Sequence, residues 1–176
     1  MEVRILRLDH RIIRDSRTST HLLLVARAFG ANGVLYTGRV DKTLEERVKK
    51  VVDDWGDSFK MKFCNDWKSA VKEWKGKGGE IIHLTMYGLP IHKVIEKIRL
   101  SQKPKLVVVG GAKVPSEMYE LANWNVSITS QPHSEIAALS VFLHEFFEGK
   151  ELIKHFNGAK LKIVPQKQGK KIIVED

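Results

Sequence analysis

The sequence predicts an α/β fold in which a mainly parallel β-sheet is flanked by helices. Short apolar segments of strand length alternate over residues 3–148 with longer segments whose apolar residues recur at helical spacing. Some strand-like segments, such as residues 105–109, are almost entirely apolar, which is typical of parallel strands covered on both faces. This alternation indicates a parallel sheet with helices on both sides.

The expected strands share short length and apolar or β-branched character, and they cover residues 3–8, 34–36, 59–64, 80–86, 105–109 and 126–129. A polar, arginine-rich connection is expected over residues 9–15. The expected helices cover residues 19–29, a segment ending at residue 55, and residues 67–74, 91–100, 115–122 and 133–148. Asp41 or Thr43 can cap the second helix, and Pro115 suits the start of the fifth.

The carboxyl-terminal residues differ in character from the rest. Residues 1–149 are expected to form one domain, and residues 150–176 a short extension packed on it. Two apolar segments, 161–164 and 172–174, flank a turn with proline and glycine and predict a small hairpin. From Gly149 onward there are seven lysines and three acidic residues. The extension is therefore either an arm that contacts RNA or a solvated edge protected by lysine.

The charge of the chain favours a polyanionic partner. Thirty Lys and Arg against 21 Asp and Glu give a net charge of +9 and a pI near 9.6. The first forty residues contain no lysine but seven of the nine arginines, namely Arg4, Arg7, Arg11, Arg14, Arg17, Arg27 and Arg39. Heat adaptation would also explain a high charge. It would not separate arginine from lysine along the chain, whereas phosphate recognition would, because guanidinium is a rigid planar donor.

Several classes of protein are excluded or disfavoured by the sequence. The single cysteine, Cys64, excludes an internal disulfide and a thiolate metal cluster, and no bound metal is expected. Walker, Gly-x-Gly-x-x-Gly and His-Glu-x-x-His motifs do not occur. No apolar run approaches the span of a membrane and the first residues do not form a signal peptide, so a soluble, cytoplasmic protein without membrane contact is expected.

Small or polar residues follow three of the expected buried strands. The segments are residues 84–88, 110–115 and 128–135, and Gly110 and Gly111 allow the backbone to approach a ligand closely. The carboxyl ends of parallel strands meet at one edge of a sheet, where α/β proteins bind ligands. The three loops are therefore predicted to surround one crevice if their strands are neighbours.

These loops, together with two segments near the amino terminus, resemble the SPOUT class of RNA methyltransferases. The matching segments span nearly the whole chain and are residues 14–21 (RDSRTSTH), 26–31 (ARAFGA), 84–88 (LTMYG), 109–115 (VGGAKVP) and 127–135 (SITSQPHSE). Within this class the chain is most similar to archaeal enzymes that methylate the ribose 2'-hydroxyl of cytidine 56 in the tRNA T-loop. The resemblance implies a carboxyl-terminal trefoil knot, S-adenosylmethionine as cofactor and tRNA as partner.

The resemblance also implies which residues bind the cofactor. They are the residues of the three strand-end loops, namely Leu84, Gly110, Gly111, Ala112, Lys113, Val114, Ile128, Thr129, Ser130, Gln131, Pro132, His133, Ser134 and Glu135. The helix expected over residues 133–148 is apolar almost all round, which predicts burial. In the SPOUT class this helix packs at a subunit interface, so a homodimer is expected; the alternative is an ordinary core helix.

Methyl transfer to a ribose hydroxyl requires in-line placement, help in removing the proton and a cation beside the adjacent phosphate. Arg17 is the first candidate for that cation because it sits in the arginine-rich loop between the first expected strand and the first expected helix. His21 and Asp15 are the further catalytic candidates.

Three alternative functions remain open from the sequence. A non-catalytic RNA-binding α/β protein would explain the charge but not the glycine-bearing loops. A SPOUT methyltransferase could act on another RNA nucleotide. An unrelated nucleotide-binding enzyme on a flavodoxin-like sheet would be expected to carry an acidic or Walker-type motif, which is absent.

Overall fold

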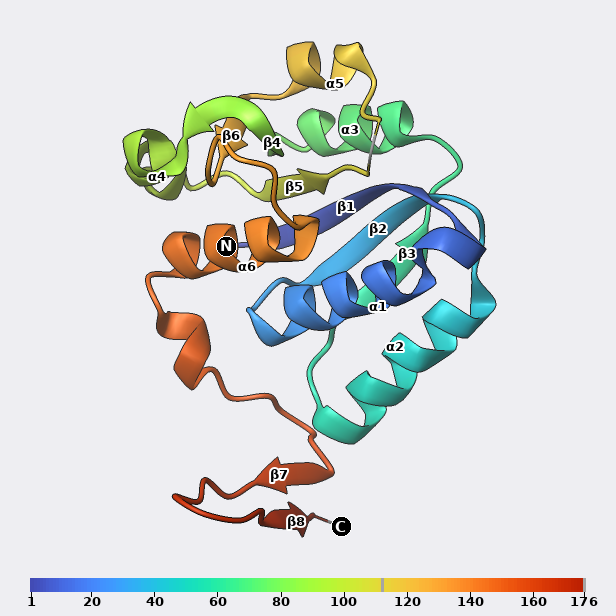
Figure 1. The fold of residues 1–176 in the computed structure, drawn as a ribbon, viewed down its shortest axis with the longest axis vertical. Helices are drawn as coiled ribbons and strands as arrows, with labels where there is room; N and C mark the ends of the chain where they lie inside the picture. The colour runs from blue at the N-terminus through green and yellow to red at the C-terminus, as the bar shows by residue number, and fades with distance from the viewer. Residues whose placement is uncertain (112, 176) are drawn as a thin grey trace.

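The computed structural model describes residues 1–111 and 113–175, which form a six-stranded sheet and a separate small hairpin (Figure 1). The order of the large sheet is β3-β2-β1-β5-β4-β6, and all of its pairings are parallel. Its strands are β1 Val3–His10, β2 Gly33–Gly38, β3 Lys60–Phe63, β4 Glu80–Pro90, β5 Lys105–Val109 and β6 Trp124–Ser127. The predicted α/β class with a mainly parallel sheet is confirmed.

Helices cover both faces of this sheet. They are α1 Ile12–Ala28, α2 Lys42–Trp55, α3 Trp67–Gly76, α4 Ile91–Leu100, α5 Ser116–Leu121, α6 Glu135–Phe147 and the 3-10 helix η1 Lys150–Ile153. Helices α1, α2, α4 and α6 pack on one face, and α3 and α5 on the other. Side chains of β5 alternate between the two cores, with Val107 and Val109 facing the first and Leu106 and Val108 the second.

The predicted connection over residues 9–15 is wrong, because most of this segment is helix. Strand β1 extends to His10, and α1 begins at Ile12, seven residues before the predicted start at residue 19. Ile12 and Ile13 are 47% and 99% exposed. The first turn of α1 therefore lacks the buried apolar stripe by which a helix is recognised in a sequence. As a result, Arg17 lies on a helix and not in a loop.

Strand β4 is longer than predicted because it contains a bulge. Leu84 and Leu89 both lie opposite the same residue of β6, Val126. The intervening residues 85–88 leave the ladder, and pairing resumes after them. The bulge turns residues 85–88 out of the sheet at the edge where β5 and β6 also end.

The predicted carboxyl-terminal hairpin is present, formed by antiparallel β7 Leu161–Ile163 and β8 Ile172–Val174. The segment that leads to it lies against the end of α2. Arg27 donates to the carbonyl oxygens of Trp55 and Gly56 at 2.6 and 2.7 Å, and its guanidinium lies 4.7 Å from the Phe156 ring centroid. These contacts give Arg27 a structural role, fixing the path of the chain into the extension.

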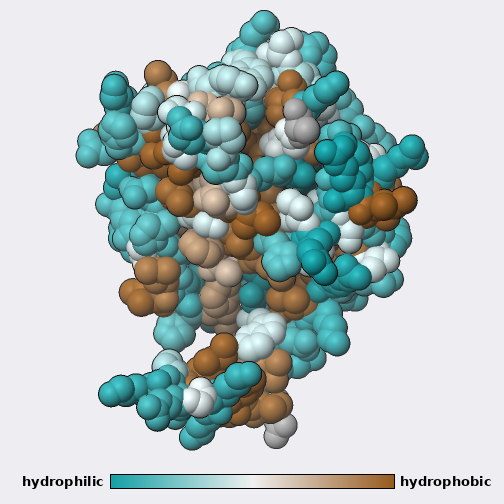
Figure 2. Space-filling model, viewed as in Figure 1, coloured by the Kyte–Doolittle hydropathy of each residue, from teal (hydrophilic) through white to brown (hydrophobic). Residues whose placement is uncertain are grey.

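Apolar side chains are exposed over the middle of the face on which α1 and α6 lie (Figure 2). Helix α6 buries Leu139, Phe142 and Leu143, but Val141 on its outer side is 40% exposed. The prediction of an entirely buried helix therefore holds for only one side of α6. Within the described part of the chain, no helix combines the length and apolar character needed to cross a bilayer.

Candidate active site

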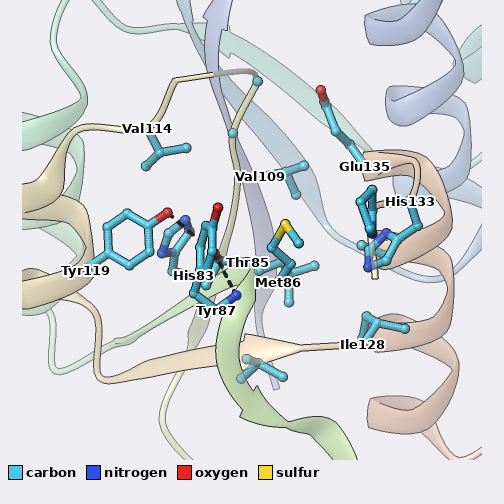
Figure 3. A pocket seen from close by; sticks show the side chains of 16 residues that line it. His83, Thr85, Met86, Tyr87, Val109, Val114, Tyr119, Ile128, His133 and Glu135 are labelled. Atoms are coloured by element: carbon cyan, nitrogen blue, oxygen red, sulfur yellow. Dashed lines mark hydrogen bonds between the residues drawn. The ribbon is translucent and has the colours of Figure 1, made fainter. Parts of the chain in front are cut away.

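A cavity of about 300 Å³ lies at the carboxyl ends of β4, β5 and β6 (Figure 3). All three predicted loops contribute to its walls, because β5 and β6 both pair with β4. Its described lining residues are His83, Leu84, Thr85, Met86, Tyr87, Val109, Gly110, Gly111, Val114, Tyr119, Val126, Ile128, Pro132, His133, Glu135 and Ala138. A wider, more open hollow beside the hairpin contains none of the predicted site residues.

Glycine is required at two places around this cavity. A Cβ on Gly88 would lie 2.5 Å from backbone atoms of Asn125 and Val126, so the bulge of β4 touches β6 directly. A Cβ on Gly110 would lie 2.1 Å from a methyl group of Val114, so the turn after β5 folds back tightly on itself. Both close approaches narrow the space around the cavity and leave backbone groups at its wall.

One wall of the cavity carries a polar group that the sequence did not single out. Asn125 donates from its amide nitrogen to the Tyr119 carbonyl at 2.8 Å, which orients its side-chain oxygen toward His83 Nδ1, 2.9 Å away. His83 must therefore carry its proton on Nδ1. Burial lowers the pKa of His83, although the Asn125 contact opposes this, so the ring is neutral. In the sequence, the only indication of this polar group was a histidine inside the otherwise apolar segment predicted as strand 80–86.

Another residue missed from the sequence, Arg7, lies behind the glycine turn on β1. Its side chain is 2% exposed, and Nη1 lies 2.6 Å from Glu135 Oε2 at the start of α6. These two atoms are close but not aligned as a hydrogen bond, so the contact is mainly Coulombic. Burial raises the pKa of Glu135, while the charge of Arg7 opposes the rise.

Of the three predicted catalytic residues, only Asp15 is buried. It lies in the first turns of α1 and accepts hydrogen bonds from the backbone N–H, Nε and Nη2 of Arg11 at 3.1, 2.9 and 3.3 Å. Burial raises the pKa of Asp15, but the hydrogen bonds from Arg11 outweigh it and the pKa falls below its usual value. Asp15 is therefore a weak base.

Arg17 and His21 do not line the cavity. Both are exposed on α1, and their spacing from exposed Arg14 places the three side chains on one face of the helix. This arginine–histidine face, defined by Arg14, Arg17 and His21, is positively charged and open to a large ligand.

The predicted cofactor residues divide into two groups. Those that line the cavity are Leu84, Gly110, Gly111, Val114, Ile128, Pro132, His133 and Glu135. The other described ones lie outside the lining and are Lys113, Thr129, Ser130, Gln131 and Ser134. Ser134 caps α6 by accepting from two backbone N–H groups, and Thr129 accepts from the Gln131 N–H. Ala112 lies outside the described residues.

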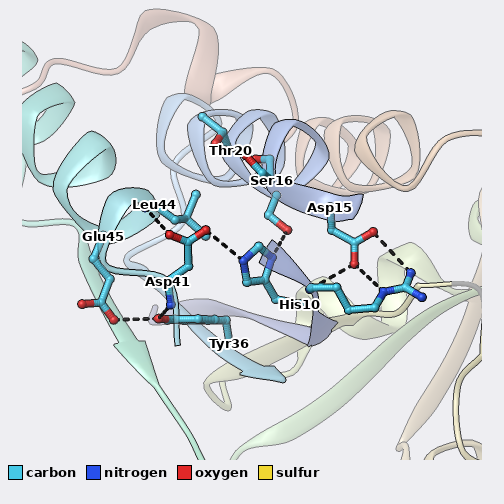
Figure 4. A network of polar contacts seen from close by, with 10 residues as sticks. His10, Asp15, Ser16, Thr20, Tyr36, Asp41, Leu44 and Glu45 are labelled. Carbon is cyan, nitrogen blue, oxygen red and sulfur yellow. Dashed lines mark hydrogen bonds and ion pairs between the residues drawn. The ribbon is translucent and has the colours of Figure 1, made fainter. Parts of the chain in front are cut away.

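A buried polar network fixes α1 against α2 (Figure 4). His10 is fully buried at the end of β1, with Nδ1 2.8 Å from the Ser19 hydroxyl and Nε2 3.2 Å from Asp41 Oδ2. Asp41 also caps α2 by accepting from the Leu44 N–H at 3.0 Å, so of the two candidate caps, Asp41 and Thr43, it is Asp41 that acts. The network thus sets the position of the helix that carries the arginine–histidine face.

Comparison with known proteins identifies the family. The model of the family described as tRNA ribose 2'-O-methyltransferase, aTrm56, matches residues 55–173. A relative from Hyperthermus butylicus, named tRNA (cytidine(56)-2'-O)-methyltransferase, is 52% identical over 171 residues, covering 97% of this chain and 91% of its own. A protein of the same name from Methanocaldococcus jannaschii is 49% identical over 177 residues, covering 99% of this chain and 98% of its own.

Solved structures share the fold at low sequence identity. The TrmH/SpoU tRNA modifying enzyme of A. aeolicus has a TM-score of 0.62 and 13% identity, covering 86% of this chain and 77% of its own. The SpoU methyltransferase AviRb from Streptomyces viridochromogenes, solved in complex with the cofactor AdoMet, has a TM-score of 0.60 and 14% identity, covering 88% of this chain and 59% of its own. The fold is therefore that of SpoU-type methyltransferases, and the chain belongs to the family of tRNA ribose 2'-O-methyltransferases.

Proposed function

We propose that this protein transfers a methyl group from S-adenosylmethionine to the ribose 2'-hydroxyl of cytidine 56 in the tRNA T-loop. The observation that carries the proposal is the cavity built by three strand-end loops in a chain of this family. The named activity of relatives that match almost the full chain supplies the nucleotide.

The cavity suits the proposed cofactor. Leu84, Val109, Ile128 and Ala138 provide apolar walls for an adenine ring, and the turn at Gly110 exposes backbone groups that can bind its polar edge. The volume of about 300 Å³ lies at the lower end of the range for small-molecule sites. When bound, the cofactor supplies a methyl group activated by its sulfonium.

The arginine–histidine face of α1 suits the RNA. Arg14 and Arg17 are exposed, and a guanidinium can bind a phosphate through two parallel hydrogen bonds. This face belongs to the helix whose first turns approach Glu135 at the cavity, so RNA held here lies next to the cofactor. The net charge of +9 adds a long-range attraction for tRNA.

We infer in addition that the chain is threaded as a trefoil knot. Residues 128–134 lead from β6 at the sheet edge to α6, whose first residue contacts Arg7 on β1. Strands β4 and β5 lie between these two points, so the segment crosses their carboxyl ends. A return of this kind across neighbouring strands is what the SPOUT knot requires.

The domain division, assembly and location follow the same proposal. Residues 1–149 contain the cavity and form the catalytic domain, and residues 150–176 form the extension. Exposed apolar side chains beside α1 and α6 support a homodimer through that face. The site of action is the cytoplasm, where tRNA is present.

The cofactor and the target nucleotide are tested separately. Calorimetric titration with S-adenosylmethionine is expected to show binding, and no binding would refute the methyltransferase proposal. Labelled cofactor is then incubated with unmodified archaeal tRNA, and the product is digested. Label is expected on the ribose of cytidine 56. Label on a base or on another ribose would refute the target, and cofactor-independent RNA binding without transfer would favour the non-catalytic alternative.

Arg17→Ala is expected to retain cofactor affinity and to lose most of the turnover. Arg17 is exposed on α1, so removing its side chain should leave the fold intact and should weaken the binding of the RNA phosphate. A loss of at least about tenfold in kcat/KM for tRNA is expected, equal to about 1.4 kcal/mol. Arg47→Ala, on the exposed side of α2, is the matched control. Unchanged turnover in Arg17→Ala would remove this residue from the reaction.

A further inference from the structure

Two carboxylates meet where α1, α6 and β1 come together, and they differ in the hydrogen bonds they make. Both oxygens of Asp15 accept hydrogen bonds from Arg11. Glu135 Oε2 is buried against Arg7, whereas Oε1 accepts no hydrogen bond within the described residues, and the side chain as a whole is 30% exposed. Only Glu135 therefore has an oxygen that is available to a ligand.

Glu135 is also the only acidic side chain of the described cavity lining. It is the first residue of α6 and lies on the α6 side of the cavity, across from Tyr119 (Figure 3). Its side chain is 30% exposed, so a ligand can reach it. The amino terminus of a helix also attracts negative charge, so this position suits a carboxylate.

The surroundings shift the pKa values of the two carboxylates in opposite directions. Burial raises the pKa of Glu135, and the charge of Asp15 raises it further, while Arg7 and Arg11 oppose the rise. Hydrogen bonds from Arg11 lower the pKa of Asp15. Neighbouring groups whose pKa values are driven apart commonly have different roles in acid–base chemistry, and the one with the raised pKa is the better base.

We propose that Glu135 is the catalytic residue that accepts the proton of the ribose 2'-hydroxyl, and that Arg7 is its positioning residue. This inference rests on the proposed function. Glu135 Oε1 takes the proton as the O–H bond breaks, and the 2'-oxygen uses that electron pair to bond to the methyl carbon. The bond from this carbon to sulfur breaks, and its electron pair stays on sulfur as a neutral thioether. Glu135 then loses its proton to solvent.

Arg7 is suited to position Glu135 because it is held rigidly in the sheet. It is 1% exposed on the central strand β1, which pairs with β2 and β5. A Cβ on Gly111 would lie 3.9 Å from both terminal nitrogens of Arg7, so the turn after β5 passes directly over the guanidinium. Arg7 therefore fixes one carboxylate oxygen and directs the other outward.

The test compares Glu135→Gln with Glu145→Gln, an exposed carboxylate further along α6. Transfer is measured in a single turnover with saturating cofactor and tRNA. Glu135→Gln is expected to bind S-adenosylmethionine within about threefold of the unchanged protein and to lose at least about 100-fold in rate. Glu145→Gln should match the unchanged protein. Loss of cofactor binding in Glu135→Gln, or a rate within about threefold, would overturn the proposal.

The role of Arg7 is tested by pH dependence in Arg7→Gln. A base acts when ionised, so the rate rises with pH through its pKa. Removing the Arg7 charge removes the interaction that lowers this pKa, so the acid limb of the rate profile should move to higher pH. A limb that stays in place while the rate falls equally at every pH would mean that Arg7 has a purely structural role.

A measurement that needs no turnover separates this inference from the proposed function. Carbon-13 NMR of glutamate-labelled protein follows the Glu135 carboxyl, which is assigned by its absence in Glu135→Gln. The pH at the midpoint of its titration should lie above that of an exposed glutamate and should move to higher pH in Arg7→Gln. An ordinary midpoint that is unchanged in Arg7→Gln would refute the inference even if tRNA is methylated. If tRNA is not methylated by the unchanged protein, it is the proposed function that fails.

Discussion

Gly88→Ala is expected to weaken cofactor binding at least about tenfold while the chain still folds. The new Cβ would lie 2.5 Å from the backbone of Asn125 and Val126, and backbone cannot rotate away as a side chain can. Strands β4 and β6 must then separate at the cavity. We expect a loss of about 1–3 kcal/mol in stability from overpacking and at least about a tenfold loss in affinity for S-adenosylmethionine.

Gly76→Ala is the matched control, because nothing lies within 4 Å of a Cβ at that position. It should leave binding unchanged. Calorimetry gives the affinities, and urea unfolding gives the stabilities. Unchanged cofactor affinity in Gly88→Ala would show that the β4 bulge does not shape the binding site.

Asp41→Ala is expected to produce the largest loss of stability among the changes considered. It removes the cap of α2, worth about 1 kcal/mol, and it leaves the fully buried His10 without its partner at Nε2. An unsatisfied buried polar group costs about a further 1–3 kcal/mol. The expected total, measured by urea unfolding, is about 2–4 kcal/mol.

Asp66→Ala isolates the capping contribution. Asp66 caps α3 by accepting from the Lys68 and Ser69 N–H groups, but it is exposed and holds no buried side chain. Its loss should cost only about 1 kcal/mol. Equal losses in the two variants would mean that the His10 network adds nothing to the cap.

The sequence was sufficient to predict the sheet, its helices and the loops that surround the cavity. The strand predicted over residues 105–109 and the amphipathic helix predicted over residues 91–100 have the boundaries that their patterns indicate. Whether the three loops converge depends on which strands are neighbours in the sheet, and no local sequence pattern contains that information. The structure gives the order β5-β4-β6, which brings the three loops together. The tertiary pairing decides this part of the site.

The errors have a common physical cause, which is that local pattern does not report long-range contacts. Helix α1 begins earlier than predicted. Ile12 and Ile13 in its first turn are exposed, so this turn shows no buried apolar stripe from which a helix could be recognised. Arg7 was only one arginine among seven in the first forty residues, although it is almost fully buried. Its ion pair with Glu135 joins residues that are far apart in sequence. Burial and partner together, not residue type, distinguish this arginine from those on the surface.

The ion pair between Arg7 and Glu135 also bears on how the protein is made. Arg7 is among the first residues to leave the ribosome, whereas Glu135 follows only after all six strands of the large sheet. Until α6 is in place, the sheet encloses a guanidinium without its partner, which costs about 3–5 kcal/mol. Closing the sheet around Arg7 is therefore less favourable for an unfinished chain than for one that already includes Glu135.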